Sequence, residues 1–151
     1  MTTAVQALGP GFATVVISGV GSIVLYALLG LVLLLLGFWV IDLTTPGKLN
    51  RLVRAGRPNA VAVTGAGLVS MAFVVVVAIY SSAGALGEGL LRTLIFGLVG
   101  VVVQAVAVRI LEWVTGIDIG GVLAAEEVRP EATVVCAAHL ALGLVVAIAV
   151  L

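Results

Sequence analysis

The chain has 151 residues, of which 63% are hydrophobic and 9% are charged, and its mean hydropathy is +1.39. This composition excludes a water-soluble globule, because too few polar residues are available to cover its surface, and it predicts a protein embedded in lipid. The seven acidic and seven basic residues cancel. Net charge therefore indicates no particular partner. Because basic residues are not in excess, the sequence does not predict nucleic-acid binding.

Four apolar runs reach or approach the length needed to cross a bilayer, which is about 20 helical residues for roughly 30 Å of hydrocarbon. They are residues 18–41, 60–80, 91–114 and 132–151. The runs are apolar on all sides, whereas barrel strands alternate apolar and polar positions. The sequence therefore predicts an all-α membrane protein with four transmembrane helices.

Residues 1–17 precede the first run and are expected to form an interfacial or extracytoplasmic segment. They contain no Lys or Arg, and the run that follows is longer than the core of a signal peptide, so we expect the first span to remain in the mature protein. Residues 12–17 are also uncharged. Either they extend a strongly tilted first helix or they lie at the interface, and the sequence leaves both open.

The connection between the first two spans is basic. Leu49, Leu52 and Val53 have the spacing of one helical face, which predicts a short amphipathic helix at the membrane surface. Residues 42–57 carry a net charge of +3. The basic side chains predicted to contact lipid or a cytoplasmic partner are Lys48, Arg51, Arg54 and Arg57.

The connection between the last two spans repeats this apolar spacing at Ile119, Val122 and Leu123 but has the opposite charge. Residues 118–131 carry a net charge of −3, with Glu126 and Glu127 on the predicted polar face. Two interpretations remain open. The linkers pair with each other, within one chain or between neighbouring chains, or they are separate interfacial loops, the basic one attracted to anionic lipid.

Two similar steps open the second and fourth spans. Arg57-Pro58-Asn59-Ala60 is followed 72 positions further on by Arg129-Pro130-Glu131-Ala132, and a tryptophan lies near the end of each preceding run, at Trp39 and Trp113. The pattern predicts two parallel repeats, each a helical hairpin, at residues 18–80 and 91–151. Asn59 and Glu131 are predicted to cap the helices that they open.

Basic residues that flank spans are retained on the cytoplasmic side. Apart from Arg92, all of them lie in or next to the two linkers. We therefore expect both linkers in the cytoplasm and both termini outside.

Few polar residues lie inside the spans. Arg109 and Glu112 share a helical face and can neutralise each other, while Gln104 lies near mid-membrane and needs a partner on another helix. His139 either forms a hydrogen bond within the bundle or relays protons. Together the four residues form a candidate intramembrane polar site.

Small residues recur at helical spacing and predict close packing between helices, and they favour a homo-oligomer. The predicted contact seams are Ala62, Ala66 and Ser70 in the second span, His139, Gly143 and Ala147 in the fourth, and Gly30 and Gly37 in the first.

Motifs for catalysis and cofactor binding were not found. The single His and single Cys136 cannot make a structural zinc site, and neither a phosphate-binding glycine loop nor a nucleophile elbow is present. The sequence predicts no cofactor and no enzymatic activity.

The chain resembles the YjfL-like bacterial inner-membrane proteins, an uncharacterised family built on a domain of unknown function. The resemblance rests on the Asp-x-x-Thr-Pro step at Asp42, Thr45 and Pro46 and on the Asn-Ala-x-Ala opening at Asn59. Members usually repeat an Asn-x-Ala-Ala opening at the last span, and Glu131-Ala132-Thr133-Val134 departs from it. The resemblance implies a plasma-membrane location, no assigned reaction, and a weak link to envelope stress.

The sequence therefore leaves two alternative functions open. The first is a non-enzymatic oligomeric scaffold or envelope-stress accessory protein that recruits lipid or a cytoplasmic partner through its linkers. The alternative is a small homo-oligomeric channel or transporter with a polar path near Gln104, Arg109, Glu112 and His139.

Overall fold

The computed structural model of this chain describes residues 11–44, 48–81, 85–149 and 151, and these ranges contain helices but no β-strand. Four helices are long and apolar enough to cross a membrane. They are α2 (Phe12–Thr44), α4 (Pro58–Tyr80), α5 (Leu86–Thr115) and α7 (Pro130–Ala149), and the linkers contain the short helices α3 (Leu49–Arg54) and α6 (Ile119–Ala124). The predicted all-α class with four membrane-spanning helices is confirmed.

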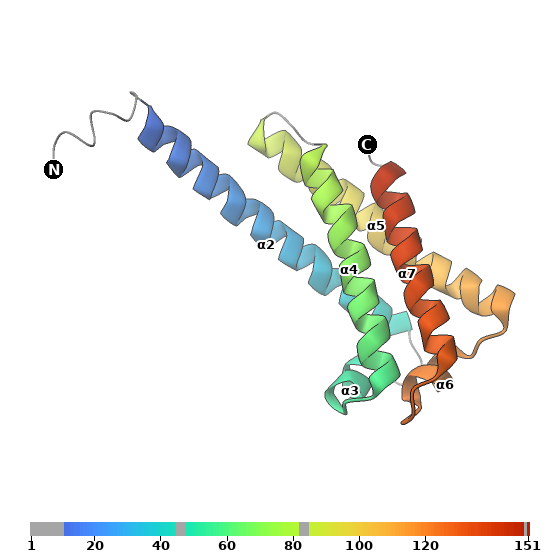
Figure 1. The fold of residues 1–151 in the computed structure, drawn as a ribbon. Coiled ribbons are helices and arrows are strands. Elements are labelled where there is room, and N and C mark those ends of the chain that lie inside the picture. The colour runs from blue at the N-terminus through green and yellow to red at the C-terminus, as the bar shows by residue number, and fades with distance from the viewer. Residues whose placement is uncertain (1–10, 45–47, 82–84, 150) are drawn as a thin grey trace.

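The two short helices lie at the same end of the bundle, where α3 contacts α6 (Figure 1). We call this the linker end. The C-terminus, the end of α4 and the start of α5 lie at the opposite end (Figure 1). Successive spans therefore run through the bundle in alternating directions.

The first span continues without a break through the residues before the predicted start at Ser18. Residues 12–17 belong to one continuous helix of 33 residues, about 50 Å long at 1.5 Å per residue. It runs at a slant to α4 and α7, and so does α5 (Figure 1). Residues 1–10 of the predicted N-terminal segment lie outside the described residues.

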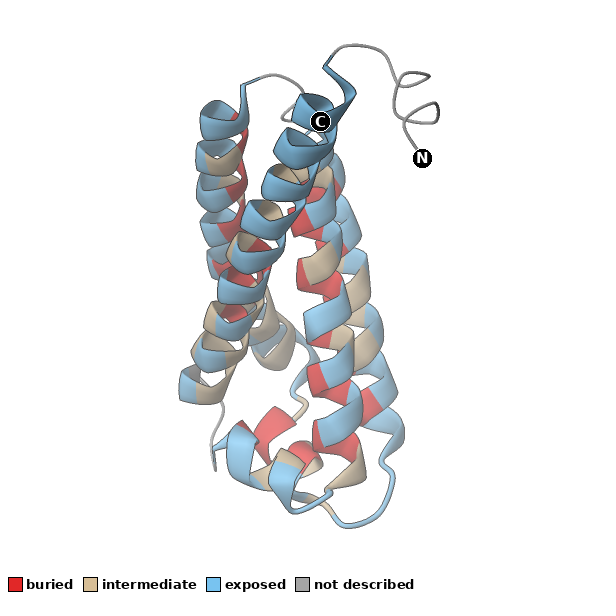
Figure 2. Cartoon of the chain, turned by 90° about the vertical axis from the view of Figure 1, so that its left-hand side faces the viewer, coloured by how far each residue is buried: buried red, intermediate tan, exposed pale blue. Residues whose placement is uncertain are grey.

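Helix α4 is central and contacts α2, α5 and α7. Its buried positions recur at helical spacing and include Val63, Gly67, Ser70, Val74 and Ala78. Buried residues line the facing sides of the helices, and exposed residues cover the outside (Figure 2). An apolar outer surface with a thin buried seam is the pattern of a bundle solvated by lipid.

Most of the predicted contact seams are confirmed. His139, Gly143 and Ala147 are all buried in α7, and Gly30 and Gly37 are buried in α2.

The seam predicted for α4 is wrong at two of its three positions. Ala62 is exposed and Ala66 is only half-buried, so Ser70 alone belongs to the contact. The four-residue spacing identified a face of small residues, but the face that packs is set by the neighbouring helices.

The short helices close the linker end of the bundle. Leu49, Ile119 and Leu123 are buried in one cluster with Val63 of α4 and Val135 of α7. The predicted amphipathic spacing is confirmed, but the apolar faces are covered by the protein's own spans rather than by lipid.

Aspartates fix where both short helices begin. Asp42 Oδ1, in the last turns of α2, accepts a hydrogen bond of 2.7 Å from the backbone N–H of Asn50. Asp118 precedes α6, and its Oδ1 accepts one of 3.0 Å from Gly121. These bonds satisfy free donors at the helix N-termini. The Asp42 bond also gives a physical reason for an aspartate at the start of the Asp-x-x-Thr-Pro step.

Candidate functional site

A buried polar cluster joins α4, α5 and α7 within the span region, and it consists of Ser70, Gln104 and His139. Gln104 Nε2 donates a hydrogen bond to Ser70 Oγ. Ser70 Oγ in turn donates to the backbone carbonyl of His139 over 2.5 Å. None of the three residues is more than 1% exposed. The predicted hydrogen bond from Gln104 to another helix is therefore present.

The close approach of α4 and α7 depends on glycine opposite Ser70. A Cβ added at Gly143 would lie 2.8 Å from both the Cα and the carbonyl oxygen of Ser70. Gly67 is adjacent to the histidine ring, since a Cβ there would lie 3.9 Å from His139 Nδ1. Small residues thus bring the backbones together and leave space for the imidazole.

Two atoms of the cluster have no hydrogen-bond partner within the described residues, namely Gln104 Oε1 and His139 Nδ1. A buried polar atom left without a partner costs about 1–3 kcal/mol. Gln104 Oε1 and His139 Nδ1 can therefore form a hydrogen bond with one further polar group.

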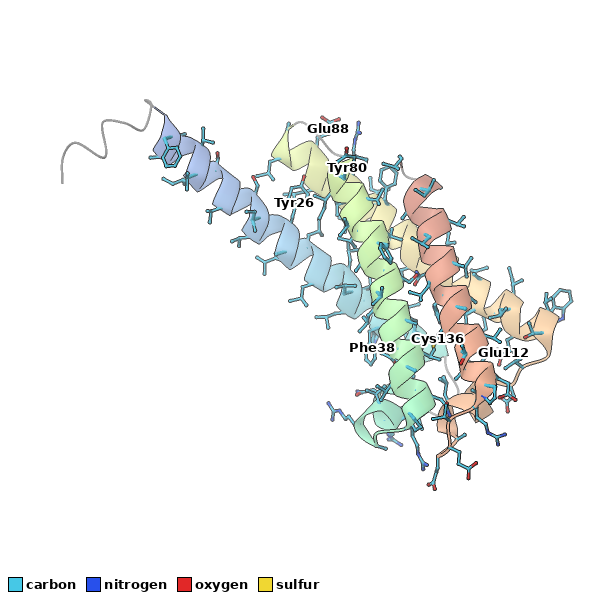
Figure 3. All side chains as sticks on the ribbon, viewed as in Figure 1. Tyr26, Phe38, Tyr80, Glu88, Glu112 and Cys136 are labelled. Atoms are coloured by element: carbon cyan, nitrogen blue, oxygen red, sulfur yellow. The ribbon has the colours of Figure 1, made fainter. Side chains whose placement is uncertain are left out.

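Arg109 and Glu112 form a separate pair. Arg109 Nη1 lies 2.6 Å from Glu112 Oε2, and the two side chains are 43% and 26% exposed. Figure 3 shows Glu112 toward the linker end of α5 and Glu88 at the opposite end. The structure thus divides the predicted intramembrane site: Gln104 and His139 join through Ser70, and Arg109 and Glu112 form a separate, partly exposed pair toward the linker end of α5.

Asn59 connects the two halves of the chain. Its Nδ2 donates to the carbonyl oxygens of Val122 (3.0 Å) and Glu127 (2.7 Å), and its Oδ1 accepts from the backbone N–H of Arg129 (2.9 Å). The side chain is 1% exposed. We call these three bonds the Asn59 clasp, and they hold the acidic linker against the start of α4.

The predicted capping role of Asn59 is wrong. Arg57 occupies the N-cap position of α4 without a side-chain hydrogen bond, and Pro58 fills the first turn. Glu131 is likewise the second residue of α7, after Pro130, and so does not precede the helix. Its negative charge in the first turn is still favourable.

Charge also pairs the two linkers within the chain. Arg57 Nη1 lies 2.6 Å from Glu126 Oε1, with the side chains 30% and 82% exposed. The linkers therefore meet, as one of the two open interpretations required. Lys48, Arg51 and Arg54 are exposed and form no ion pair with any described residue.

We expect the Arg57–Glu126 pair to be weak. Arg57→Gln and Glu126→Gln should show a coupling free energy of about 0.2–1 kcal/mol in a double-mutant cycle, because exposed ion pairs are screened by water and salt. The measurement is unfolding in mixed detergent micelles at low and high salt. Arg54→Gln with Glu126→Gln is the matched control and should show no coupling. A coupling above about 2 kcal/mol that salt does not reduce would contradict this account.

Ser70 was not predicted as a polar site residue. It was grouped with the alanines as a small packing residue, because its spacing matched theirs. The available signal was its hydroxyl, since a buried hydroxyl in a dry span needs a partner.

Within the described residues, no three His, Cys, Asp or Glu side chains gather as metal ligands.

Four apolar spans, closed at one end by amphipathic helices and joined inside by a buried polar cluster, define a multi-pass helical membrane protein. The chain belongs to the family described as Domain of Unknown Function (DUF350), whose model matches residues 14–150.

Similar proteins of known sequence come from mycobacteria. A UPF0719 transmembrane protein of Mycolicibacterium paratuberculosis is 43% identical over 93 residues, which cover 61% of this chain and 62% of the relative. A UPF0719 transmembrane protein of Mycobacterium bovis is 39% identical over 100 residues, 66% of each chain. The chain thus covers less than two thirds of these relatives' length. No solved structure matches.

Proposed function

We propose that this chain is a non-enzymatic, oligomeric scaffold of the bacterial plasma membrane and a YjfL-like member of its family. In this role the spans anchor the protein in lipid. The linker end recruits anionic lipid or a cytoplasmic partner.

The observation that carries the proposal is the set of exposed basic side chains at the linker end. Inside the spans, the polar side chains of Ser70 and Gln104 bond within the chain. At the linker end, Lys48, Arg51 and Arg54 are exposed and without ion pairs among the described residues. Exposed basic side chains next to a membrane attract anionic lipid by about 1 kcal/mol each.

The same distribution supports an orientation with both linkers in the cytoplasm and both termini outside. Lys48, Arg51, Arg54 and Arg57 belong to the linker end, whereas Arg92 lies in the first turns of α5 at the opposite end and pairs with Glu88 over 3.4 Å. Basic residues near spans favour the cytoplasmic side.

A second candidate is a homo-oligomeric channel or transporter. Gln104 Oε1 and His139 Nδ1 favour it, because both are buried and unpartnered within the described residues. A polar path would need such groups to contact a solute or water during passage.

Liposome flux separates the two candidates. The scaffold proposal expects purified protein to conduct protons and small ions no faster than protein-free liposomes, and Gln104→Leu to change nothing. Flux that Gln104→Leu or His139→Leu abolishes would reverse the ranking.

Site-specific crosslinking tests recruitment directly. A photo-crosslinking residue at Arg51 should capture anionic lipid or a defined cytoplasmic protein in cells. The same residue at Arg92, at the opposite end, is the matched control and should capture neither. Equal products at both positions would contradict the proposed role of the linker end.

A further inference from the structure

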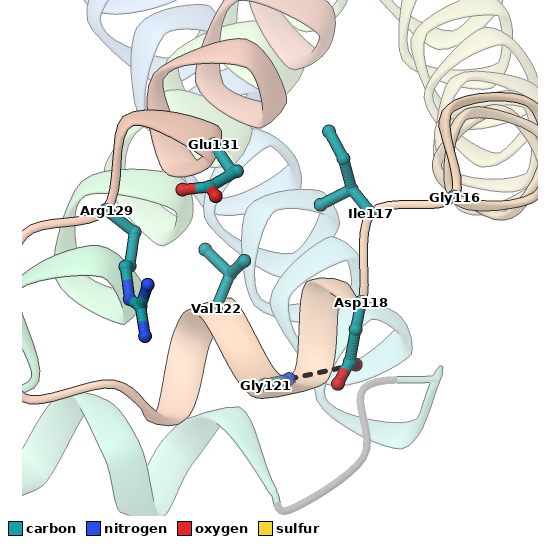
Figure 4. Close-up of a pocket in the computed structure, with 7 residues that line it drawn as sticks. All are labelled: Gly116, Ile117, Asp118, Gly121, Val122, Arg129 and Glu131. Atoms are coloured by element: carbon teal, nitrogen blue, oxygen red, sulfur yellow. Dashed lines mark hydrogen bonds between the residues drawn. The ribbon is translucent and has the colours of Figure 1, made fainter.

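A polar pocket of about 460 Å³ lies at the linker end, between the end of α5, α6 and the start of α7. Figure 4 shows Arg129 and Asp118 on opposite sides of it, with Val122 between them, Glu131 above and the short helix α6 as the floor. Its volume is in the range of small-ligand sites. The pocket is separate from the buried polar cluster and from the basic helix α3.

Basic and acidic side chains line this pocket, and their charged groups form few bonds with other described residues. Arg129 and Glu131 make no ion pair with any described residue. Asp118 Oδ1 accepts from Gly121, which leaves its second oxygen without a described hydrogen bond. The pocket therefore offers one guanidinium and two carboxylates to a ligand.

The chain holds these groups in place. The backbone N–H of Arg129 is bonded to Asn59 Oδ1 over 2.9 Å, and Glu131 stands in the first turn of α7. Gly121 lets its backbone approach Asp118, since a Cβ there would lie 2.5 Å from Asp118 Oδ2. The backbone of Arg129 and the carboxylate of Asp118 are thus held at the pocket, while the guanidinium of Arg129 makes no ion pair with a described residue and can move toward a ligand.

The pocket lies beside the ends of two membrane-spanning helices. It begins where α5 ends at Thr115 and where α7 begins at Pro130. Trp113, one turn before it, is 84% exposed, and exposed tryptophan is typical of the membrane–water interface. Because spans end where the hydrocarbon gives way to lipid headgroups, a phospholipid headgroup is the ligand that this position favours.

We propose that this pocket binds the headgroup of phosphatidylethanolamine, with the phosphate on Arg129 and the primary ammonium on Glu131 and Asp118. A guanidinium suits a phosphate because it donates several hydrogen bonds in one plane. The ammonium donates three hydrogen bonds, which the carboxylate oxygens can accept.

The lining argues against the other common headgroups. Choline cannot donate a hydrogen bond from its nitrogen and is usually held by aromatic rings, and no aromatic residue lines the pocket. Phosphatidylglycerol has a phosphate but no ammonium, so it leaves two carboxylates facing an anion. The inference does not depend on the proposed scaffold role.

Lipid titration of the purified full chain in detergent tests the proposal. Ethanolamine, choline and glycerol phospholipids with identical acyl chains are added separately, and bound lipid is counted by native mass spectrometry. Phosphatidylethanolamine should bind at least about tenfold more tightly than the other two, the ratio expected for one charge-assisted hydrogen bond. Soluble glycerophosphoethanolamine is a further arm, and its competition would show that the headgroup alone is recognised.

Two variants locate the site. Arg129→Gln and Glu131→Gln should each weaken phosphatidylethanolamine binding by about tenfold or more. Glu127→Gln removes a carboxylate from the same linker but outside the pocket and should have no effect. Unchanged helical circular dichroism confirms folding. Equal binding of the three lipids by the wild-type chain, or unchanged binding by both pocket variants, would overturn the proposal.

Discussion

Replacing Gly143 with alanine should force α4 away from α7 and lower the free energy of unfolding by about 3 kcal/mol. The added Cβ would lie 2.8 Å from the Cα and the carbonyl oxygen of Ser70, which are backbone atoms and cannot turn aside. Within a bilayer, helices associate through close packing and hydrogen bonds rather than the hydrophobic effect. Displacing Ser70 also breaks its bond to His139 and its contact with Gln104.

The measurement is unfolding of the purified chain with increasing SDS in mixed micelles, followed by circular dichroism. Gly65→Ala is the matched control, because nothing lies within 4 Å of a Cβ at that position of α4. Alanine is the better helix former, so this control should be neutral or stabilising by up to about 1 kcal/mol. Equal stability of the two variants would show that Gly143 does not set the distance between the helices.

Replacing Asn59 with aspartate should open the linker end and destabilise the protein by about 3 kcal/mol or more. The aspartate keeps an oxygen for the N–H of Arg129 but turns the donor that bonds Val122 and Glu127 into an acceptor. The carbonyl oxygens of Val122 and Glu127 would then face a carboxylate next to a side-chain position that is 1% exposed. Unpaired groups of this kind are costly because the site is almost dry.

Protease accessibility of the linkers, measured beside unfolding in mixed micelles, distinguishes local opening from global loss. Asn50→Asp makes the same chemical change on the exposed surface of α3 and should leave both measurements near wild type. If Asn59→Asp behaves like Asn50→Asp, the clasp does not hold the acidic linker.

The sequence predicted what local periodicity controls. Long apolar runs predicted the four spans, and the three-and-four spacing of Leu49, Leu52 and Val53 predicted the short helix α3. Gly143 and His139 were also assigned to a packing face, because a stripe of small residues marks where backbones approach. Each of these features depends on residues less than a few turns apart.

Features that depend on distant partners were missed. Asn59 looked like a helix cap, since asparagine after proline suits that role, but its partners lie 63–70 residues away. Ala62 and Ser70 share a stripe, yet only Ser70 meets α7. One helical pattern does not determine which of its faces meets which neighbour, and so the clasp and the polar cluster required the assembled bundle.

The Asn59 clasp also has a consequence for biosynthesis. Asn59 is incorporated 70 residues before Arg129, an interval of roughly 4–14 s at about 5–20 residues per second. Helix α2 is already complete when Asn59 is incorporated, and α4 and α5 follow during this interval, before the carbonyls of Val122, Glu127 and His139 to which Asn59 and Ser70 donate hydrogen bonds. Until these partners are made, the polar side chains of Asn59 and Ser70 lie in the first hairpin without these hydrogen bonds. They gain their partners only when α6 and α7 have been synthesised. In a nascent chain that stalls before α6, these two side chains would remain without their partners, which would distinguish the incomplete chain from the finished protein.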